Sequence, residues 1–175
     1  MAAAASSTTA RIEQLAAFGR GRQSLNESVW YNGSLLTFLA TGEDTQGKFA
    51  LIELIGTKAS VPPPHIHHRE DEAFYILEGE ITASVGGQTI KAGPGGFVFL
   101  PRDVMHSFTA DTEQVRILVL LAPAGFEGYF KDCSVPATAM TLPPPDASQP
   151  EIQKLISVAA NYGLEFVLPE VDSAT

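Results

Sequence analysis

The chain has 175 residues, of which 45% are hydrophobic and 18% charged, proportions ordinary for one globular domain with a substantial core. A formal net charge of −9, without any basic cluster, argues against nucleic-acid binding. No apolar run approaches the ~18 residues that span a bilayer, and the N-terminus lacks a signal-peptide pattern. The single cysteine, Cys133, cannot form an internal disulfide. We therefore expect a cytoplasmic protein that binds neither nucleic acids nor membranes.

The first part of the chain predicts a short irregular segment followed by strands. Residues 1–22 are expected to be disordered or weakly helical, because the first nine residues are small and polar and two glycines follow the only helix-compatible stretch, 11–18. Asn32-Gly33 separates two β-favouring stretches, 29–31 and 34–40, and predicts a hairpin. Residues 49–55 predict a further strand.

Strand signals continue at even spacing through the middle of the chain. Gly86-Gly87 is a two-residue hairpin turn between predicted strands at 80–85 and 88–91. Three more strands are predicted at 97–100, 106–110 and 115–121, and the last is apolar enough to suggest burial on both faces. Short strands separated by turn residues indicate an antiparallel sandwich or barrel.

Residues 136–175 have a different character. A proline-rich connector at 142–145 precedes a capping box at 148–151. Apolar residues then recur at helical spacing from Ile152 to Ala160, and Gly163 is a stop signal. We expect a C-terminal helix that packs on the outside of the β-structure or on a partner subunit.

The residues that carry chemistry are concentrated between Pro62 and Gly79. His65 and His67 lie two apart, so on an extended strand they share one face, with Cα atoms about 6–7 Å apart. Two such imidazoles can converge on one metal ion. Glu72, five residues after His67, would point to the opposite face of an unbroken strand. We therefore expect the polar run 68–71 to break the strand and a neighbouring strand to bring in the carboxylate.

A third candidate imidazole follows a strand and a proline-marked turn, at His106. All four histidines of the chain lie in these two stretches. His68 falls on the face opposite His65 and His67, so we expect it to be exposed or to act behind the ligands. Glu70 and Asp71 compete with Glu72 for the carboxylate role, and Glu72 is preferred because it leads directly into the next strand.

His65, His67, His106 and Glu72 would suit one divalent transition-metal ion, and ligand type alone does not choose among Ni, Mn, Fe, Co, Cu and Zn. The lack of thiolates disfavours a purely structural zinc site. The alternative is that these are ordinary core or surface histidines beside a solvated acidic turn. Strand parity places Phe74 and Ile76 on the side of Glu72, and Phe108 on the side of His106. These residues predict an apolar pocket for a planar hydrophobic ligand, unless they only fill the interior.

Together the two stretches resemble the paired motifs of the cupin family. The first motif, HxH, four residues, glutamate, six residues, glycine, is complete from His65 to Gly79. The second runs from Gly95 through Pro101 to His106, with Asp103 in place of the usual turn glycine and Ala110 in place of the usual asparagine. Neither change touches the ligand set, and aspartate tolerates left-handed backbone.

The cupin resemblance covers roughly residues 34–131 and implies an all-β fold, the cupin jelly-roll β-barrel. We place this domain at 23–135, with the C-terminal α-helix packed outside. The resemblance also implies that His65, His67, Glu72 and His106 are the metal ligands. By analogy between folds alone it implies a homodimer, with the region around Trp30 or the tail helix as candidate interfaces.

Residues 122–131 resemble the segment that runs over the barrel mouth in flavonol 2,4-dioxygenases (quercetinases), and the tail helix, 152–166, is similar to that of quercetinase-like cupins. In that family phenylalanines stand where this chain has Phe74, Phe108, Phe126 and Phe130. The resemblance implies a dioxygenase that cleaves a flavonol-like aromatic enol with O2, with Glu72 as ligand and proton acceptor. Two alternatives stay open: a cupin enzyme for another small molecule, such as a diketone or enol oxygenase, and a non-catalytic cupin that binds a metal or small molecule.

Overall fold

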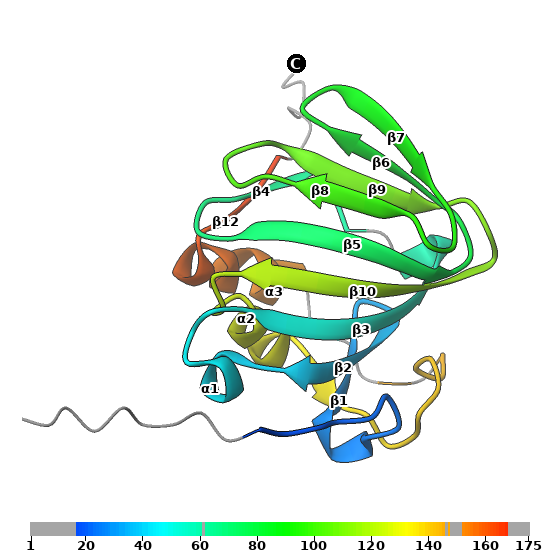
Figure 1. Cartoon of the computed structure of the whole chain (residues 1–175), viewed down its shortest axis with the longest axis vertical. Helices are drawn as coiled ribbons and strands as arrows, with labels where there is room; N and C mark the ends of the chain where they lie inside the picture. Colours follow the sequence, from blue (N-terminus) through cyan, green and yellow to red (C-terminus); the bar gives the residue numbers. More distant parts are fainter. Residues whose placement is uncertain (1–16, 61, 146, 148–151, 168–175) are drawn as a thin grey trace, which may run out of the picture.

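The computed structural model of the chain describes residues 17–60, 62–145, 147 and 152–167 (Figure 1). Within those residues it is mostly β, with strands β1 Ser28–Tyr31, β2 Ser34–Ala40, β3 Ala50–Thr57, β4 His65–His67, β5 Asp71–Glu78, β6 Ile81–Val85, β7 Gln88–Ala92, β8 Phe97–Leu100, β9 His106–Ala110, β10 Gln114–Ala122, β11 Val135–Pro136 and β12 Leu164–Phe166. The described part of the chain also contains three short α-helices, α1 Gly42–Thr45, α2 Glu127–Asp132 and α3 Ile152–Ala159, and 3-10 turns at Leu25–Glu27, Lys58–Ser60 and Ala160–Tyr162.

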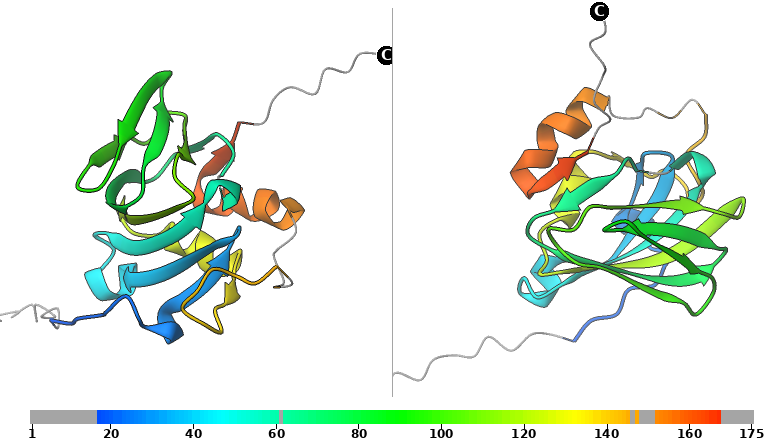
Figure 2. Two further views of the ribbon diagram at one scale, coloured as in Figure 1. Left: turned by 90° about the vertical axis from the view of Figure 1, so that its right-hand side faces the viewer. Right: turned by 90° about the horizontal axis from the view of Figure 1, so that it is seen from above.

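The strands form two antiparallel sheets that face each other across one core (Figure 2). The larger sheet has the order β11-β1-β2-β3-β10-β5-β8, and the smaller has the order β12-β4-β9-β6-β7. The core draws apolar side chains from both sheets, among them Ile52, Ile76, Ile117, Ile81 and Ala83. This arrangement confirms the predicted all-β jelly-roll class.

Both predicted two-residue hairpins are present, because their turn residues adopt left-handed backbone. Asn32 and Gly33 have φ of 46° and 75° between β1 and β2, with Tyr31 opposite Ser34. Gly86 and Gly87 have φ of 55° and 83° between β6 and β7. Positive φ at both central residues is the type I′ geometry that matches strand twist. Asp103, with φ of 62°, takes the left-handed turn position that we expected it to tolerate.

The expectation that residues 115–121 are buried on both faces is wrong. In β10 burial alternates: Val115, Ile117, Val119 and Leu121 are buried, whereas Leu120 on the other face is 38% exposed. One face of this antiparallel sheet packs on the core, and helices α2 and α3 lie behind it in the view of Figure 1, so the front face of β10 has no covering layer there. Apolar residues on that face therefore reach the surface.

The C-terminal region contributes a strand as well as a helix, and the predicted helical stretch 152–166 is wrong in its last part. Helix α3 continues into a 3-10 turn that Gly163 ends with φ of 67°. Residues 164–166 then form β12, which pairs with β4 in the smaller sheet. Leu155 and Val158 of α3 pack against the core, as expected for a helix on the outside of the barrel.

Two expectations fall wholly or partly outside the described residues: the weak helix at 11–18, of which only 17 and 18 are described and are not helical, and the capping box at 148–151. The domain boundary at residue 135 remains a prediction, and strands from both sides of it join the two sheets. A search of the described residues for a helix long and apolar enough to span a membrane finds none.

Candidate metal centre

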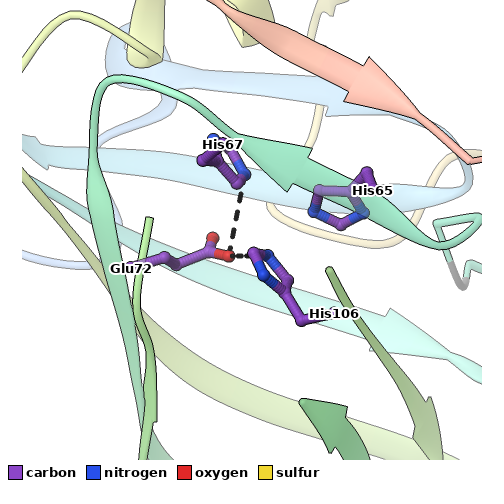
Figure 3. A group of neighbouring side chains, drawn as sticks. All are labelled: His65, His67, Glu72 and His106. Atoms are coloured by element: carbon purple, nitrogen blue, oxygen red, sulfur yellow. Dashed lines mark ion pairs between the residues drawn. The ribbon is translucent and has the colours of Figure 1, made fainter. Parts of the chain in front are cut away.

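Four side chains from three strands meet at one point between the two sheets (Figure 3). They are His65 and His67 of β4, Glu72 of β5 and His106 of β9, and one candidate ligand atom from each lies within 4.8 Å of all the others. All four side chains are buried. The structure therefore brings together the set singled out in the sequence, and their role as metal ligands remains a prediction.

The strand arrangement explains how residues far apart in sequence converge. Strands β4 and β9 are neighbours in the smaller sheet, and His65 lies directly opposite His106 in their register. The chain leaves β4 after His67 and enters the larger sheet at Asp71, so the expected break is present. Glu72 was expected from a neighbouring strand. It comes instead from the facing sheet, which lets its carboxylate point at the imidazoles across the core.

Backbone carbonyls select the tautomer of two of the imidazoles. The Nδ1 atom of His65 lies 2.8 Å from the carbonyl oxygen of Pro63, and Nδ1 of His106 lies 2.9 Å from that of Val104. Because a carbonyl oxygen only accepts hydrogen bonds, each Nδ1 carries the proton. The lone pair of each ring is then on Nε2, which is the arrangement that a metal-binding imidazole needs.

The donor set fits a cation at its centre. Nε2 of His106 lies 3.3 Å from Oε2 of Glu72, and Nε2 of His67 lies 3.8 Å from the same oxygen. Among the described residues, the buried Nε2 of His106 has no hydrogen-bond partner. Lone pairs and a carboxylate that face one another repel, and a cation among them removes the repulsion. Three imidazoles and one carboxylate suit a divalent first-row transition ion.

The protonation states agree with this assignment. Burial lowers the pKa of His65 to about 4, so its ring is neutral and available as a ligand at neutral pH. Burial by itself would raise the pKa of Glu72, but the nearby imidazoles, His106 foremost, hold it below the ordinary value, so this residue is a carboxylate. Burial by itself would lower the pKa of His106, but the Glu72 carboxylate raises it above the ordinary value. The negative charge of Glu72 thus favours a positive charge at the centre.

An apolar cavity of about 60 Å3 adjoins His65, His67 and Glu72. Phe74, Phe108, Phe126 and Phe130 line it as the sequence predicted, and the Phe126 ring meets the His67 ring edge to face at 4.2 Å between centroids. Ile76 does not line the cavity. Although it shares a face with Glu72, it lies two residues further along β5 than Phe74, fully buried in the core.

Several residues that line this cavity were not predicted from the sequence, because they come from distant elements. Tyr31 precedes the first hairpin turn, Tyr129 lies in α2, and Leu164 and Phe166 belong to the unpredicted strand β12. For Tyr129 a signal existed, since it lies within the segment 122–131 that carried the family resemblance. Strand parity within β12 could have found the pair in that strand only if residues 164–166 had been recognised as extended.

A second cavity of about 560 Å3 lies beside the first and shares with it the residues Tyr31, Asn32, Pro62, Phe108 and Phe166. Its remaining lining comes from the proline run, β9 and α3, namely Pro63, Pro64, Ser107, Thr109, Leu155 and Ile156. We call this second cavity the outer groove.

His68 and Asp71 lie away from the centre. The His68 side chain is 43% exposed, and its ring nitrogens lie 2.7 Å from Oδ1 of Asp103 and 3.0 Å from Oε2 of Glu165. Its exposure agrees with the expectation from strand parity. Asp71 pairs with Arg102 at 2.8 Å and does not face the imidazoles. Glu70 is buried behind His67, at 3.9 Å from its Nδ1 atom.

Comparison with known proteins agrees with the fold. The family model described as "Cupin domain" matches residues 52–121. The chain is 32% identical to quercetin 2,3-dioxygenase of Bacillus subtilis over 98 residues, which are 56% of this chain and 29% of that protein. It is 28% identical to quercetin 2,3-dioxygenase of Aspergillus japonicus over 127 residues, 67% of this chain and 35% of that protein. The chain thus spans about a third of the length of these two relatives.

A solved structure with the same fold is an RmlC-like cupin from Shewanella frigidimarina, which matches with a TM-score of 0.52 and 18% identity over 60% of this chain and 91% of that one. The complete first motif, the two facing antiparallel sheets and these matches lead to one assignment. The chain belongs to the cupin family, and its cupin domain is similar to those of quercetin dioxygenases.

Proposed function

We propose that this protein is a metal-dependent dioxygenase that cleaves a flavonol-like aromatic enol with O2. The observation that carries the proposal is the convergence of His65, His67, Glu72 and His106 beside an aromatic cavity, which the first three of them line. The similarity to two quercetin dioxygenases supports the substrate class. For a flavonol the reaction balances as flavonol plus O2 giving a depside plus carbon monoxide.

The four residues would hold the ion through the Nε2 atoms of the three imidazoles and a carboxylate oxygen of Glu72. A bound divalent ion would lower the pKa of a coordinated enol hydroxyl. Glu72 would accept the proton that this hydroxyl loses, because it is ionised and lies at the same point as the imidazoles. It would therefore act as both ligand and base.

The cavity residues would bind and orient the substrate. Phe74 and Phe108 meet edge to face at 5.2 Å between ring centroids, Phe126 and Phe130 do so at 5.0 Å, and both pairs line the cavity. A planar aromatic ligand packs well on such surfaces, and its burial would exclude water from the reacting enolate. The outer groove would be the route by which the substrate arrives.

Oxygen consumption with quercetin tests the proposal. Wild-type protein with a quantified transition-metal content should consume O2 and release carbon monoxide, and anaerobic titration should shift the flavonol absorption band. Glu72→Gln should bind the flavonol and retain metal but lose turnover. Normal turnover by that variant would contradict the role of Glu72 as the base, and the absence of both a spectral shift and O2 uptake would contradict the flavonol assignment.

Two other functions use the same site. The cavity lining is almost wholly apolar apart from His65, His67, Glu72 and a few hydroxyl and amide groups, so another planar enol or diketone would also fit it. A screen of such compounds by O2 uptake would distinguish this activity from flavonol cleavage. If the protein only binds a metal or small molecule, a chelator should lower its thermal stability while no compound supports O2 uptake.

We also propose that the protein is a homodimer. The Trp30 ring would contribute little to the interface, because it is 6% exposed, packs with Val135 and Ala137 and donates from Nε1 to the carbonyl oxygen of Thr141. The outer face of the larger sheet is available, with four large apolar side chains more than a third exposed on neighbouring strands, namely Tyr75, Phe97, Phe99 and Leu120. A second copy would cover apolar surface with apolar surface.

Light scattering should show a dimer that Phe97→Ser combined with Phe99→Ser converts to a monomer. A wild-type monomer would exclude the dimer.

A further inference from the structure

One of the three imidazoles at the centre differs from the other two in the hydrogen bonding of its Nδ1 atom. Nδ1 of His65 and Nδ1 of His106 each donate to the carbonyl oxygen two residues earlier. His67 has no such partner, and its buried Nδ1 makes no hydrogen bond within the described part of the chain. The tautomer and the direction of this ring are therefore not set by the backbone.

Strand position explains the difference. His65 and His106 are the first residues of β4 and β9, so the carbonyls of Pro63 and Val104 precede the strands and are free to turn toward the rings. His67 is the last residue of β4. The carbonyl two residues before it belongs to His65, within the strand, where backbone groups serve the sheet ladder. A side chain has to supply the acceptor for this ring.

Glu70 is the side chain in that position. It is 3% exposed, its Oε2 atom lies 3.9 Å from Nδ1 of His67, and within the described residues that oxygen also has no hydrogen-bond partner. A buried carboxylate without partners destabilises a fold. Two unsatisfied buried groups that face each other, one able to donate and one only to accept, indicate a functional pairing.

Two neighbouring rings pack against the His67 ring. Phe126 meets it edge to face at 4.2 Å, and the His106 ring is nearly parallel to it, with 6° between the planes at 5.5 Å. Its Nε2 atom points toward Oε2 of Glu72 at 3.8 Å and its Nδ1 toward Oε2 of Glu70 at 3.9 Å. The ring thus lies between two carboxylates, one at the metal centre and one behind it.

We propose that Glu70 is a positioning residue, which accepts the Nδ1 proton of His67 and so directs the Nε2 lone pair at the metal. This inference rests on the metal-binding part of the proposed function. The present gap exceeds a normal N–H···O distance by about 1 Å, which small side-chain rotations can close. An anionic acceptor also makes the imidazole a stronger donor to a metal than a carbonyl would. Glu70 thus takes the role that Pro63 and Val104 have for the other two rings.

The test uses Glu70→Leu and Glu70→Gln in the full chain, with Glu80→Gln, an exposed acid of the same charge, as the control. Zn²⁺ affinity is measured by competition with a chromophoric chelator. Nitrogen-15 NMR of the metal-free protein reports which nitrogen of His67 carries the proton. Thermal unfolding of the metal-free protein reports stability.

We expect Glu70→Leu to weaken Zn²⁺ binding by about 10- to 100-fold, to move the His67 proton from Nδ1 to Nε2, and to raise the melting temperature of the metal-free protein. Glu70→Gln keeps an acceptor oxygen and should show a smaller loss, and Glu80→Gln should match wild type. A purely structural Glu70 would instead lower both stability and affinity on substitution, without a change of tautomer.

Zn²⁺ affinity of Glu70→Leu within twofold of wild type, or a His67 proton that does not respond to the substitution, would overturn the proposal. Neither measurement needs oxygenase turnover. If wild-type protein bound no metal, the proposed function would fail, whereas the tautomer in the metal-free protein would still decide the role of Glu70.

Discussion

Phe166 lies directly opposite His65 in the register between β12 and β4, and Leu164 lies opposite His67. The C-terminal strand therefore supports both imidazoles of the first motif through the same ladder. Backbone bonds at the two ends of the pairing, from Val167 to Pro64 and from His68 to Gly163, hold the strands together. The position of the metal-binding strand thus depends on a segment about a hundred residues away in the chain.

Loss of packing in β12 should weaken both the fold and the site. Leu164 is 6% exposed, so Leu164→Ala should lower the free energy of unfolding by about 2–4 kcal/mol. Because β4 loses support, the Zn²⁺ affinity of the folded protein should fall as well. Urea titration and chelator competition measure the two effects, and exposed Gln153→Ala on α3 is the control. An unchanged Zn²⁺ affinity would show that β12 does not position β4.

Removal of any one of the three predicted imidazole ligands should abolish tight metal binding. His106→Ala removes one of the four converging donors, the imidazole that lies 3.3 Å from Glu72, and should weaken Zn²⁺ binding at least about 100-fold. The matched control is His68→Ala, which removes an exposed imidazole that faces away from the centre and should bind Zn²⁺ like wild type. Equal affinities for the two variants would contradict the assignment of His106.

The exposed ion-pair cluster around His68 should stabilise the protein more at low pH than at high pH. Hydrogen bonds to Asp103 and Glu165 raise the pKa of His68 above its ordinary value. A group whose pKa is raised by folding contributes stability below its unfolded pKa and loses that contribution as the pH rises through the folded pKa. The difference in melting temperature between wild type and His68→Gln, both metal-free, should therefore shrink from about pH 5.5 to pH 8.5. A difference that grows with pH would contradict this account.

The aromatic lining should affect substrate binding more than turnover. Phe130 meets Tyr31 at 5.1 Å and Phe126 at 5.0 Å between centroids, and it borders the cavity. Phe130→Leu should raise KM for a flavonol about 2- to 10-fold with little change in kcat, because an aromatic contact contributes about 0.5–1.5 kcal/mol. Phe97→Leu, on the outer sheet face, is the matched control. A loss confined to kcat would mean that Phe130 acts in the chemical step.

The outer groove should control access to the centre. Ile156 is 44% exposed and lines this groove, so Ile156→Trp should narrow it without disturbing the core. We expect kcat/KM for a flavonol to fall several-fold while Zn²⁺ affinity stays constant. Ser157→Trp adds the same ring at an exposed position that does not line the groove. If both variants have wild-type kcat/KM, the substrate takes another route.

Much of this protein could be predicted from local sequence because the relevant physics is local. Asn32-Gly33 and Gly86-Gly87 specify hairpins by their tolerance of positive φ. The two-residue spacing of His65 and His67 puts both rings on one face of a strand, whatever surrounds that strand. The polar run after His67 marks the break that lets the carboxylate of Glu72 come from elsewhere.

Only the tertiary structure decided which distant segments pair as strands and how deeply individual side chains are buried. Residues 164–166 form a strand because β4 offers them an edge, and a three-residue stretch carries too little pattern to show this. The alternation of side chains along a strand correctly placed Ile76 on the same face as Glu72. Whether Ile76 lines the cavity or is buried deeper in the core depends on how the two sheets stack. The position of Glu70 behind His67 depends on the course of the chain as it crosses from β4 in one sheet to β5 in the other. The spacing of residues in the sequence does not predict that course. Motif spacing selects the ligands because it acts within one strand, whereas the cavity and the support of each ligand arise from packing across the whole chain.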